Sequence, residues 1–266
     1  MTMSDTTVRR PIKWNSFAES NVGTVRSINE DSILSKPEIN LWAIADGMGG
    51  YEAGDVASSL IVKTLDELTY KESLSDIVNA VEDTLTDVNH RIQEYADIML
   101  DGRMLGSTVV SLLIRGRVGA CIWAGDSRLY RYRNNQLQQL SRDHSHVEEL
   151  MTQGHITAEE AANHPDSNVI TRAVGAHEEL YLDLNVFNLQ VGDTLLLCSD
   201  GLYNAVKQPD IIQFLSQPSP QLIVQHLLAK ALKNGASDNV SIIIVKGEPG
   251  SIPTPGRVDI IEGIEG

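Results

Sequence analysis

Four aspartates of this chain stand at the ends of short apolar runs. Asp46, Asp126 and Asp200 each follow such a run, and Asp238 comes just before the run 240–245. If the runs are strands of neighbouring sheets, the four carboxylates can collect at one edge of the fold. Carboxylates held close together raise one another's pKa, so a cluster of this kind requires positive partners.

Divalent cations are the partners that the sequence favours. No Lys or Arg directly accompanies Asp46, Asp200 or Asp238, although Arg128 follows closely after Asp126. Mg²⁺ and Mn²⁺ take oxygen ligands, whereas zinc is less favoured because no His or Cys stands at ligand spacing near these acids. Each aspartate alone also fits an ordinary turn, but the repetition of the pattern favours a metal site.

The segment 46–50, Asp-Gly-Met-Gly-Gly, is the most informative of these places. A strand predicted over 41–45 ends at Asp46, and the glycines let the backbone approach what the carboxylate holds. The carbonyl of Gly47 is then a further ligand. Two cations that share a bridging carboxylate are the usual means of in-line phosphate-ester hydrolysis. A phosphate-binding loop is a weaker interpretation, since the segment lacks the Lys-Ser/Thr ending of that motif.

Phosphate chemistry also requires a cation for the phosphoryl oxygens, which Arg binds in a bidentate manner better than Lys. Arg26 is the candidate, in a polar loop with Glu30 and Asp31. A surface arginine paired with those two acids is an equally good interpretation of this loop.

The periodicity of apolar residues predicts the elements that position these groups. Ser75 is the predicted cap of a helix whose apolar stripe runs from Ile77 to Ile92. Strands are predicted over 14–20, 32–35, 41–45, 106–114, 118–124, 129–132, 136–140, 180–189, 194–198 and 240–246. The other helical patterns cover 51–68, 146–153, 158–163, 209–215 and 221–233.

These elements predict an α+β fold. The strands form meanders of antiparallel neighbours with a turn at 134–135, and neither group of strands can bury both faces without helices outside it. We therefore expect two sheets packed face to face and covered by helix layers. Residues 13–247 form the predicted domain, with an N-terminal tail over 1–12 and a C-terminal tail over 248–266.

Composition restricts the partners and the compartment. The chain has 266 residues, with 36 acidic and 21 basic side chains, and its net charge of −15 repels a nucleic-acid backbone. Cys121 and Cys198 lie in apolar runs and are predicted to be buried thiols of a reducing compartment. Because we find neither a secretory leader nor an apolar stretch of about 18 residues, we expect a cytoplasmic protein without a membrane span.

Six segments, taken in order, closely resemble the metal-dependent type 2C (PPM) Ser/Thr protein phosphatases in their compact bacterial form. The resemblance covers roughly residues 14–247 and implies a four-layer αββα sandwich with a dinuclear Mn²⁺ or Mg²⁺ centre between the sheets. The segments are Val-Arg-Ser-Ile-Asn-Glu-Asp-Ser (25–32), Ala-Asp-Gly-Met-Gly-Gly (45–50), Gly-Ser-Thr (106–108), Gly-Asp-Ser-Arg (125–128), Ser-Asp-Gly-Leu (199–202) and Ser-Asp-Asn-Val (237–240).

The resemblance also implies a role for each candidate ligand. Asp46 bridges the two metals, the Gly47 carbonyl binds one of them, and Asp200 and Asp238 hold the other. Asp126 helps to hold a third, weaker ion together with Asp200, as in bacterial relatives.

By the same resemblance, Arg26 binds the substrate phosphate. Glu30, Asp31 and Asn239 lie behind or beside the metal ligands. Residues 142–178 form the flap next to the active site, where substrate selection is thought to lie.

Met48 departs from the pattern of many eukaryotic members, which carry a histidine there that is proposed as the general acid. A methionine side chain has no proton to donate. Protonation of the leaving group then falls to a metal-bound water, for instance on the third ion, or to a flap residue. The flap histidines considered are His144, His146, His155 and His164, for each of which a solvated loop side chain is the default interpretation.

The activity implied is hydrolysis of phosphoserine and phosphothreonine in proteins by a metal-bridging hydroxide. A covalent phosphoenzyme is not expected, since no Cys or Asp lies in a suitable nucleophile motif. The expected partners are substrates of a bacterial Ser/Thr kinase, in some relatives one that controls secretion. The alternative is a phosphatase-like regulatory module without turnover, against which the complete set of aspartates argues.

Overall fold

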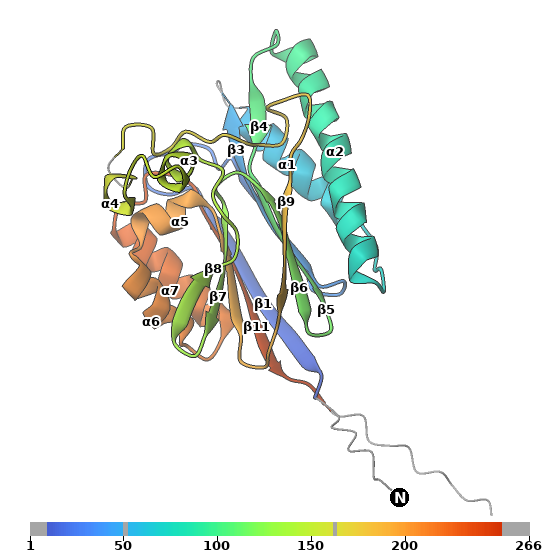
Figure 1. The fold of residues 1–266 in the computed structure, drawn as a ribbon, viewed down its shortest axis with the longest axis vertical. Coiled ribbons are helices and arrows are strands. Elements are labelled where there is room, and N and C mark those ends of the chain that lie inside the picture. Colours follow the sequence, from blue (N-terminus) through green and yellow to red (C-terminus); the bar gives the residue numbers. More distant parts are fainter. Residues whose placement is uncertain (1–9, 50–52, 162–163, 252–266) are drawn as a thin grey trace, which may run out of the picture.

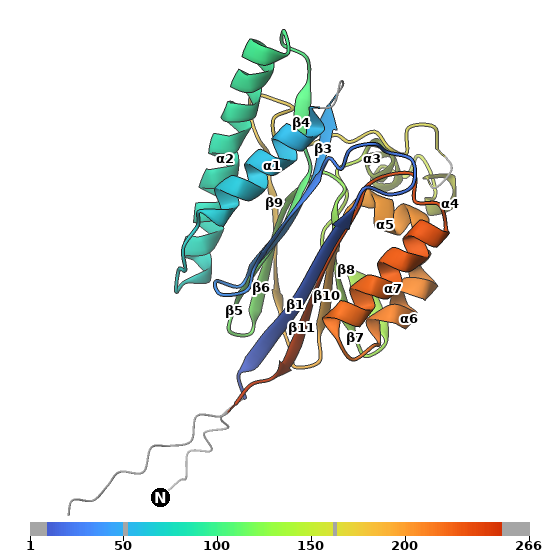
Figure 2. The same ribbon diagram turned by 180° about the vertical axis from the view of Figure 1, so that it is seen from behind.

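A computed structural model describes residues 10–49, 53–161 and 164–251 of the chain. Two antiparallel sheets lie face to face, as Figures 1 and 2 show. The first sheet has the order β1 (Ile12–Asn21), β11 (Val240–Pro249), β10 (Thr194–Cys198), β7 (Arg128–Arg133) and β8 (Gln136–Gln139). The second has the order β2 (Asp31–Lys36), β3 (Leu41–Gly49), β5 (Val109–Arg115), β6 (Val118–Ala124) and β9 (Asp183–Asn188), with β4 (Leu105–Ser107) paired to β3.

Helices cover the outer face of each sheet (Figures 1 and 2). α1 (Gly54–Asp66) and α2 (Leu74–Met99) pack on the second sheet. α5 (Asp200–Ala205), α6 (Gln208–Leu215) and α7 (Pro220–Lys233) pack on the first. The short helices α3 (His146–Thr152) and α4 (Ala158–Ala161) lie in the segment after β8. The predicted αββα sandwich is confirmed.

Three apolar cores separate the four layers. Alternation along β3 sends Ala43 toward the helices and Trp42 toward the facing sheet, because successive strand residues point to opposite faces. In β11, Ile242 and Ile244 likewise pack against helices while Ile243 lies between the sheets. The strands that carry the candidate ligands are thus buried on both faces and form a rigid frame.

The apolar stripe predicted for α2 is confirmed, since its members from Ile77 to Ile92 are all buried. The predicted cap is wrong. The helix begins at Leu74, with Ser73 as the residue before it, so that Ser75 falls inside the first turn. The hydroxyl groups of Ser73 and Ser75 bond to each other, at 2.6 Å between the oxygens.

The predicted end of the strand at Asp46 is also wrong. β3 continues to Gly49, because Gly47 and Met48 pair with Ser107 and Gly106 of β4. The short strand β4 supplies partners that local periodicity does not reveal. Helix α1 begins at Gly54, and the predicted start at 51 lies outside the described residues, as does the predicted helix end at 163.

Other differences are smaller. β9 covers Asp183–Asn188, shorter than the predicted 180–189, and a break at Thr108 divides the predicted strand 106–114 into β4 and β5. Asp200 begins helix α5, which was expected to be only a turn after a strand. The turn at Asn134 and Asn135 is confirmed, with positive φ at both residues.

The ends of the fold lie together, where β1 pairs with β11 from Ile12 opposite Pro249 to Asn21 opposite Val240. Most of the two predicted tails, residues 1–9 and 252–266, lies outside the described part of the chain. Cys121 and Cys198 are buried and free, as predicted. No helix in the described ranges is both long and apolar enough to cross a membrane.

Candidate metal centre

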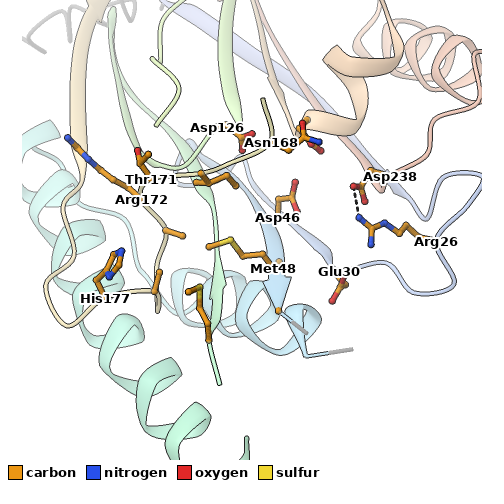
Figure 3. Close-up of a pocket in the computed structure, with 17 residues that line it drawn as sticks. Arg26, Glu30, Asp46, Met48, Asp126, Asn168, Thr171, Arg172, His177 and Asp238 are labelled. Atoms are coloured by element: carbon orange, nitrogen blue, oxygen red, sulfur yellow. Dashed lines mark hydrogen bonds and ion pairs between the residues drawn. The ribbon is translucent and has the colours of Figure 1, made fainter. Parts of the chain in front are cut away.

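One cavity of about 750 Å³ collects most of the predicted site residues (Figure 3). Of the nine candidate residues, seven line it: Arg26, Glu30, Asp46, Gly47, Asp126, Asp200 and Asp238. Asp31 and Asn239 are buried behind this lining. The cavity is therefore the place where the chain assembles its candidate chemistry.

The four aspartates reach the cavity from both sheets. Asp46 lies in β3 of the second sheet, and Asp126 follows β6 of the same sheet. Asp200 follows β10 of the first sheet, and Asp238 precedes β11. The predicted gathering of carboxylates is thus confirmed as a geometric fact.

Burial and the neighbouring carboxylates disfavour the ionised form of these aspartates. Burial raises the pKa of Asp46 well above its ordinary value, and the charge of Asp31, its partner across the β2–β3 pair, raises it further. Burial and then the charges of Asp126 and Asp238 raise the pKa of Asp200 to about 7. Burial also raises the pKa of Asp126. A bound cation reverses this cost, because an opposite charge favours the ionised form.

The donor set fits Mn²⁺ or Mg²⁺. In the described part of the chain, no three His, Cys, Asp or Glu side chains group closely enough to enclose one ion. Mg²⁺ characteristically binds through one or two carboxylates and retains several waters, and carboxylate, carbonyl and water also suit Mn²⁺. Aspartates spread around a roomy cavity match that coordination. The buried Oδ1 of Asp126, for which residues 10–49, 53–161 and 164–251 supply no hydrogen-bond partner, is available as a ligand atom.

The backbone of Asp46 is fixed by β4 and the residue after it. The hydroxyl of Ser107 donates to the Asp46 carbonyl at 2.9 Å, and the Thr108 amide donates to the same carbonyl at 2.8 Å. The Thr108 hydroxyl bonds to that of Ser127, which follows Asp126. Ser107 and Thr108 were noted only as part of a motif and fell inside the predicted strand 106–114, which gave no sign of this role.

Gly47 is required by close packing. A Cβ atom there would lie 2.1 Å from the carbonyl oxygen of Gly54 at the start of α1, and 2.7 Å from the Glu30 carbonyl oxygen. The Gly47 amide donates to that Glu30 carbonyl at 3.1 Å. The expectation of a glycine-rich turn is therefore corrected, because Gly47 is a strand residue whose missing side chain lets α1 approach the site.

Arg26 pairs with Asp238. Its Nη2 donates to Asp238 Oδ2 at 2.8 Å, while about half of the arginine side chain, 51%, is exposed (Figure 3). The alternative of an arginine paired with Glu30 and Asp31 thus gives way to a pair with Asp238, whose neighbours in the sequence include no Lys or Arg. The contact joins residues 212 positions apart, so neighbouring sequence could not reveal it.

Asn239 joins the Arg26 loop to the segment that carries Asp238. Its Oδ1 accepts from the Glu30 amide at 2.8 Å, and its Nδ2 donates to the carbonyls of Val22 and Ile28 at 3.0 Å each. Glu30 in turn accepts from the Gly54 amide at 3.0 Å.

Asp31 is held from the other sheet, where the Ser199 hydroxyl donates to its Oδ2 at 2.8 Å. Burial raises the pKa of Asp31 to about 6. Ser199 directly precedes Asp200, so this bond also links the two sheets beside the cavity.

The four flap histidines considered from the sequence are absent from the described lining of the cavity. His144 is buried, accepts from the Gly125 amide through Nδ1 at 3.1 Å, and places Nε2 3.3 Å from Asp183. His177 does line the cavity and was overlooked, although it lies within the predicted flap. Met48 lines the cavity as well.

Four layers of the αββα type, with aspartates from both sheets around one cavity and an arginine at its rim, define a metal-dependent phosphate-ester hydrolase. The sequence profile described as protein phosphatase 2C matches residues 24–234. The chain belongs to the protein phosphatase 2C family and is a protein serine/threonine phosphatase.

Individual relatives agree with this assignment. The serine/threonine phosphatase stp of Listeria innocua serovar 6a is 35% identical over 233 residues, which cover 84% of this chain and 92% of that protein. The structure of PppA, described as a key regulatory component of T6SS in Pseudomonas aeruginosa, has 42% identity and a TM-score of 0.83, and the match covers 90% of this chain and all of that one.

A third relative bears on the cofactor. The catalytic domain of the serine/threonine protein phosphatase PstP, in complex with two manganese ions, is 32% identical with a TM-score of 0.78, over 90% of this chain and 99% of that one. PstP is a protein of Mycobacterium tuberculosis. The similarity to PstP confirms the expectation of Mn²⁺ or Mg²⁺ as the cofactor.

Proposed function

We propose that this phosphatase hydrolyses phosphoserine and phosphothreonine in proteins directly, without a covalent phosphoenzyme, in the cavity between the sheets. The observation that carries the proposal is the convergence of Asp46, Asp126, Asp200 and Asp238 on that cavity with Arg26 at its rim. Their mutual repulsion and burial leave the site incomplete without cations.

Each ligand is assigned a role. Asp46 would contribute to both main ions, together with the Gly47 carbonyl for one of them and with Asp200 and Asp238 for the other. Asp126 and Asp200 would hold a third, weaker ion. Mn²⁺ or Mg²⁺ held there would supply the activation of a water nucleophile and the neutralisation of the phosphoryl oxygens. Support comes from the shared lining of the cavity by all five residues.

Arg26 binds the phosphoryl oxygens. Its ion pair with Asp238 keeps the guanidinium beside the ligands, and its exposed half leaves donors free to turn toward a substrate. Asn239 and Glu30 hold the loop that carries it, and Asp31 supports Asp46 across the strand pair.

Protonation of the leaving group falls to a water in the cavity or to a residue of the flap. Met48 has no proton to give. His177 lies across the cavity from Asp46, beyond Met48 in the view of Figure 3.

The wider assignments follow from this activity. Residues 13–247 form the catalytic domain, and 142–178 form a flap whose residues Asn168, Thr171, Arg172 and His177 face the substrate. The partners are cytoplasmic phosphoproteins that are targets of a Ser/Thr kinase. The 42% identity to PppA makes control of protein secretion the first pathway to test.

The test is hydrolysis of a phosphothreonine peptide by the metal-free protein, before and after Mn²⁺ is restored. We expect activity only with the metal, and its loss in Asp200→Asn and Asp238→Asn. Activity that survives either substitution would overturn the assignment. Isothermal titration with Mn²⁺ alone separates an enzyme with a defective step from a phosphatase-like module that binds no metal.

A further inference from the structure

Asp126 presents its two carboxylate oxygens to different surroundings. Oδ2 accepts a hydrogen bond from the phenol of Tyr203 at 3.1 Å, and the Asp126 carbonyl lies 3.2 Å from the same phenol oxygen. Oδ1 is buried and has no hydrogen-bond partner within the described residues. Asp126 is only 8% exposed and lines the cavity. Oδ2 is therefore hydrogen-bonded to Tyr203, whereas Oδ1 has no such partner among the described residues.

Tyr203 is itself held in place. The guanidinium carbon of Arg128 lies 3.6 Å from the centre of its ring, a cation–π contact. Arg128 is fixed in turn by Asp143, to which Nε donates at 3.0 Å and Nη2 at 2.6 Å. The ring therefore packs against Arg128 on one face while its hydroxyl bonds to Asp126.

This arrangement explains what Arg128 does. The sequence favoured it as the cation beside Asp126, but its guanidinium turns to Asp143 and to the ring of Tyr203. An arginine on Asp126 would neutralise the carboxylate and compete with a bound cation. A phenol donates a hydrogen bond without a positive charge, so Asp126 keeps its full charge for a metal.

We infer that Tyr203 is a positioning residue, which holds Asp126 through Oδ2 and so leaves Oδ1 free as a ligand of the weaker third ion. Helix α5 carries both Asp200, at its first position, and Tyr203, one turn later. Helix α5 thus positions Asp200 directly and Asp126 through the phenol of Tyr203. This inference rests on the proposed ligand role of Asp126.

Tyr203→Phe tests the inference, because it keeps the ring under Arg128 and removes only the hydroxyl. Isothermal titration of the metal-free full chain with Mn²⁺ should show the weakest site bound at least about tenfold less tightly, the usual effect of losing such a supporting bond. The tighter sites should be unchanged. In activity assays the Mn²⁺ concentration for half-maximal rate should rise, while the rate at saturating Mn²⁺ returns toward that of the unaltered protein.

Tyr132→Phe is the matched control. It removes a phenol hydroxyl from β7 in the same core, one that bonds to Asn135 at 2.9 Å, and should leave every Mn²⁺ site unchanged. Asp126→Asn should abolish the weak site.

Unaltered Mn²⁺ binding by Tyr203→Phe, together with loss of the weak site in Asp126→Asn, would overturn the role of Tyr203 alone. An intact weak site in Asp126→Asn would overturn the proposed ligand and this inference with it. Equal weakening of all sites in Tyr203→Phe would indicate a general structural defect and would also count against a positioning role.

Discussion

At the scale of single residues, the site is defined by carboxylates whose negative charge the protein's own side chains do not fully neutralise. Burial raises the pKa values of Asp46, Asp126 and Asp200. Asp238 forms an ion pair with Arg26, whose side chain is half-exposed. Such a cluster costs stability in the absence of metal, which is a common feature of functional sites. Two consequences can be measured on individual side chains.

The first concerns Arg26. In Arg26→Lys the charge remains but the planar fork that matches phosphoryl oxygens is lost. We expect kcat/KM for a phosphothreonine peptide to fall by about 100-fold, as when one donor to a developing charge is removed. Arg91→Lys, which alters an exposed arginine beside Asp87 on α2, is the control. Equal activity in the two variants would remove Arg26 from the phosphate-binding role.

The second concerns pH. The raised pKa values of Asp31, about 6, and Asp200, about 7, mean that the folded metal-free protein binds these protons more tightly than the unfolded chain does. Asp31 and Asp200 therefore do not lower the free energy of unfolding when the pH is below about 4, their ordinary pKa. They lower it increasingly as the pH rises through about 7. Mn²⁺ takes the place of the protons.

We thus expect the rise in Tm on adding Mn²⁺ to grow between about pH 5 and pH 8. Thermal unfolding with chelator or with MnCl₂ at each pH measures it, and Asp200→Asn should flatten the trend. A rise in Tm that is constant or shrinks toward pH 8 would contradict this account of the carboxylates.

At the scale of elements, periodicity in the sequence was enough to predict most of the frame. The stripe of α2 and the apolar runs of β3, β10 and β11 depend on local patterns. Both bounds of β10 and the first residues of β3 and β11 were predicted as observed. The extension of β3 through Gly47 could not be predicted, because it depends on pairing with β4, about 60 residues later. Helix α5 was missed since Asp200-Gly201 looks like a turn.

Gly47 supplies a prediction at this scale. In Gly47→Ala the new Cβ would meet backbone atoms of α1 and of Glu30, which have no flexible end to move aside. We expect a loss of about 3 kcal/mol in the free energy of unfolding, at the upper end for overpacking. Gly49→Ala, whose Cβ would have a Leu105 methyl group at 3.2 Å as its nearest contact, should cost clearly less in the same urea titration. Equal losses would show that the approach of α1 does not depend on Gly47.

At the scale of the whole molecule, the fold brings distant segments together at one end of a two-sheet sandwich. The four candidate aspartates could be chosen from the sequence because each stands at the end of an apolar run, which is a local signal. Their partners could not be. Arg26 reaches Asp238 across 212 positions, Ser199 reaches Asp31 across 168, and Tyr203 reaches Asp126 across 77. Only the packing of both sheets creates these contacts.

We propose that the four aspartates hold the catalytic cations in the cavity between the sheets. Anomalous X-ray diffraction from crystals of the full chain grown with Mn²⁺ can locate these ions. We expect two strong manganese peaks beside the Asp46 carboxylate, with a weaker third between Asp126 and Asp200. Manganese peaks located elsewhere would contradict this proposal. So would crystals without manganese in the cavity, if the same protein is active with Mn²⁺ in solution.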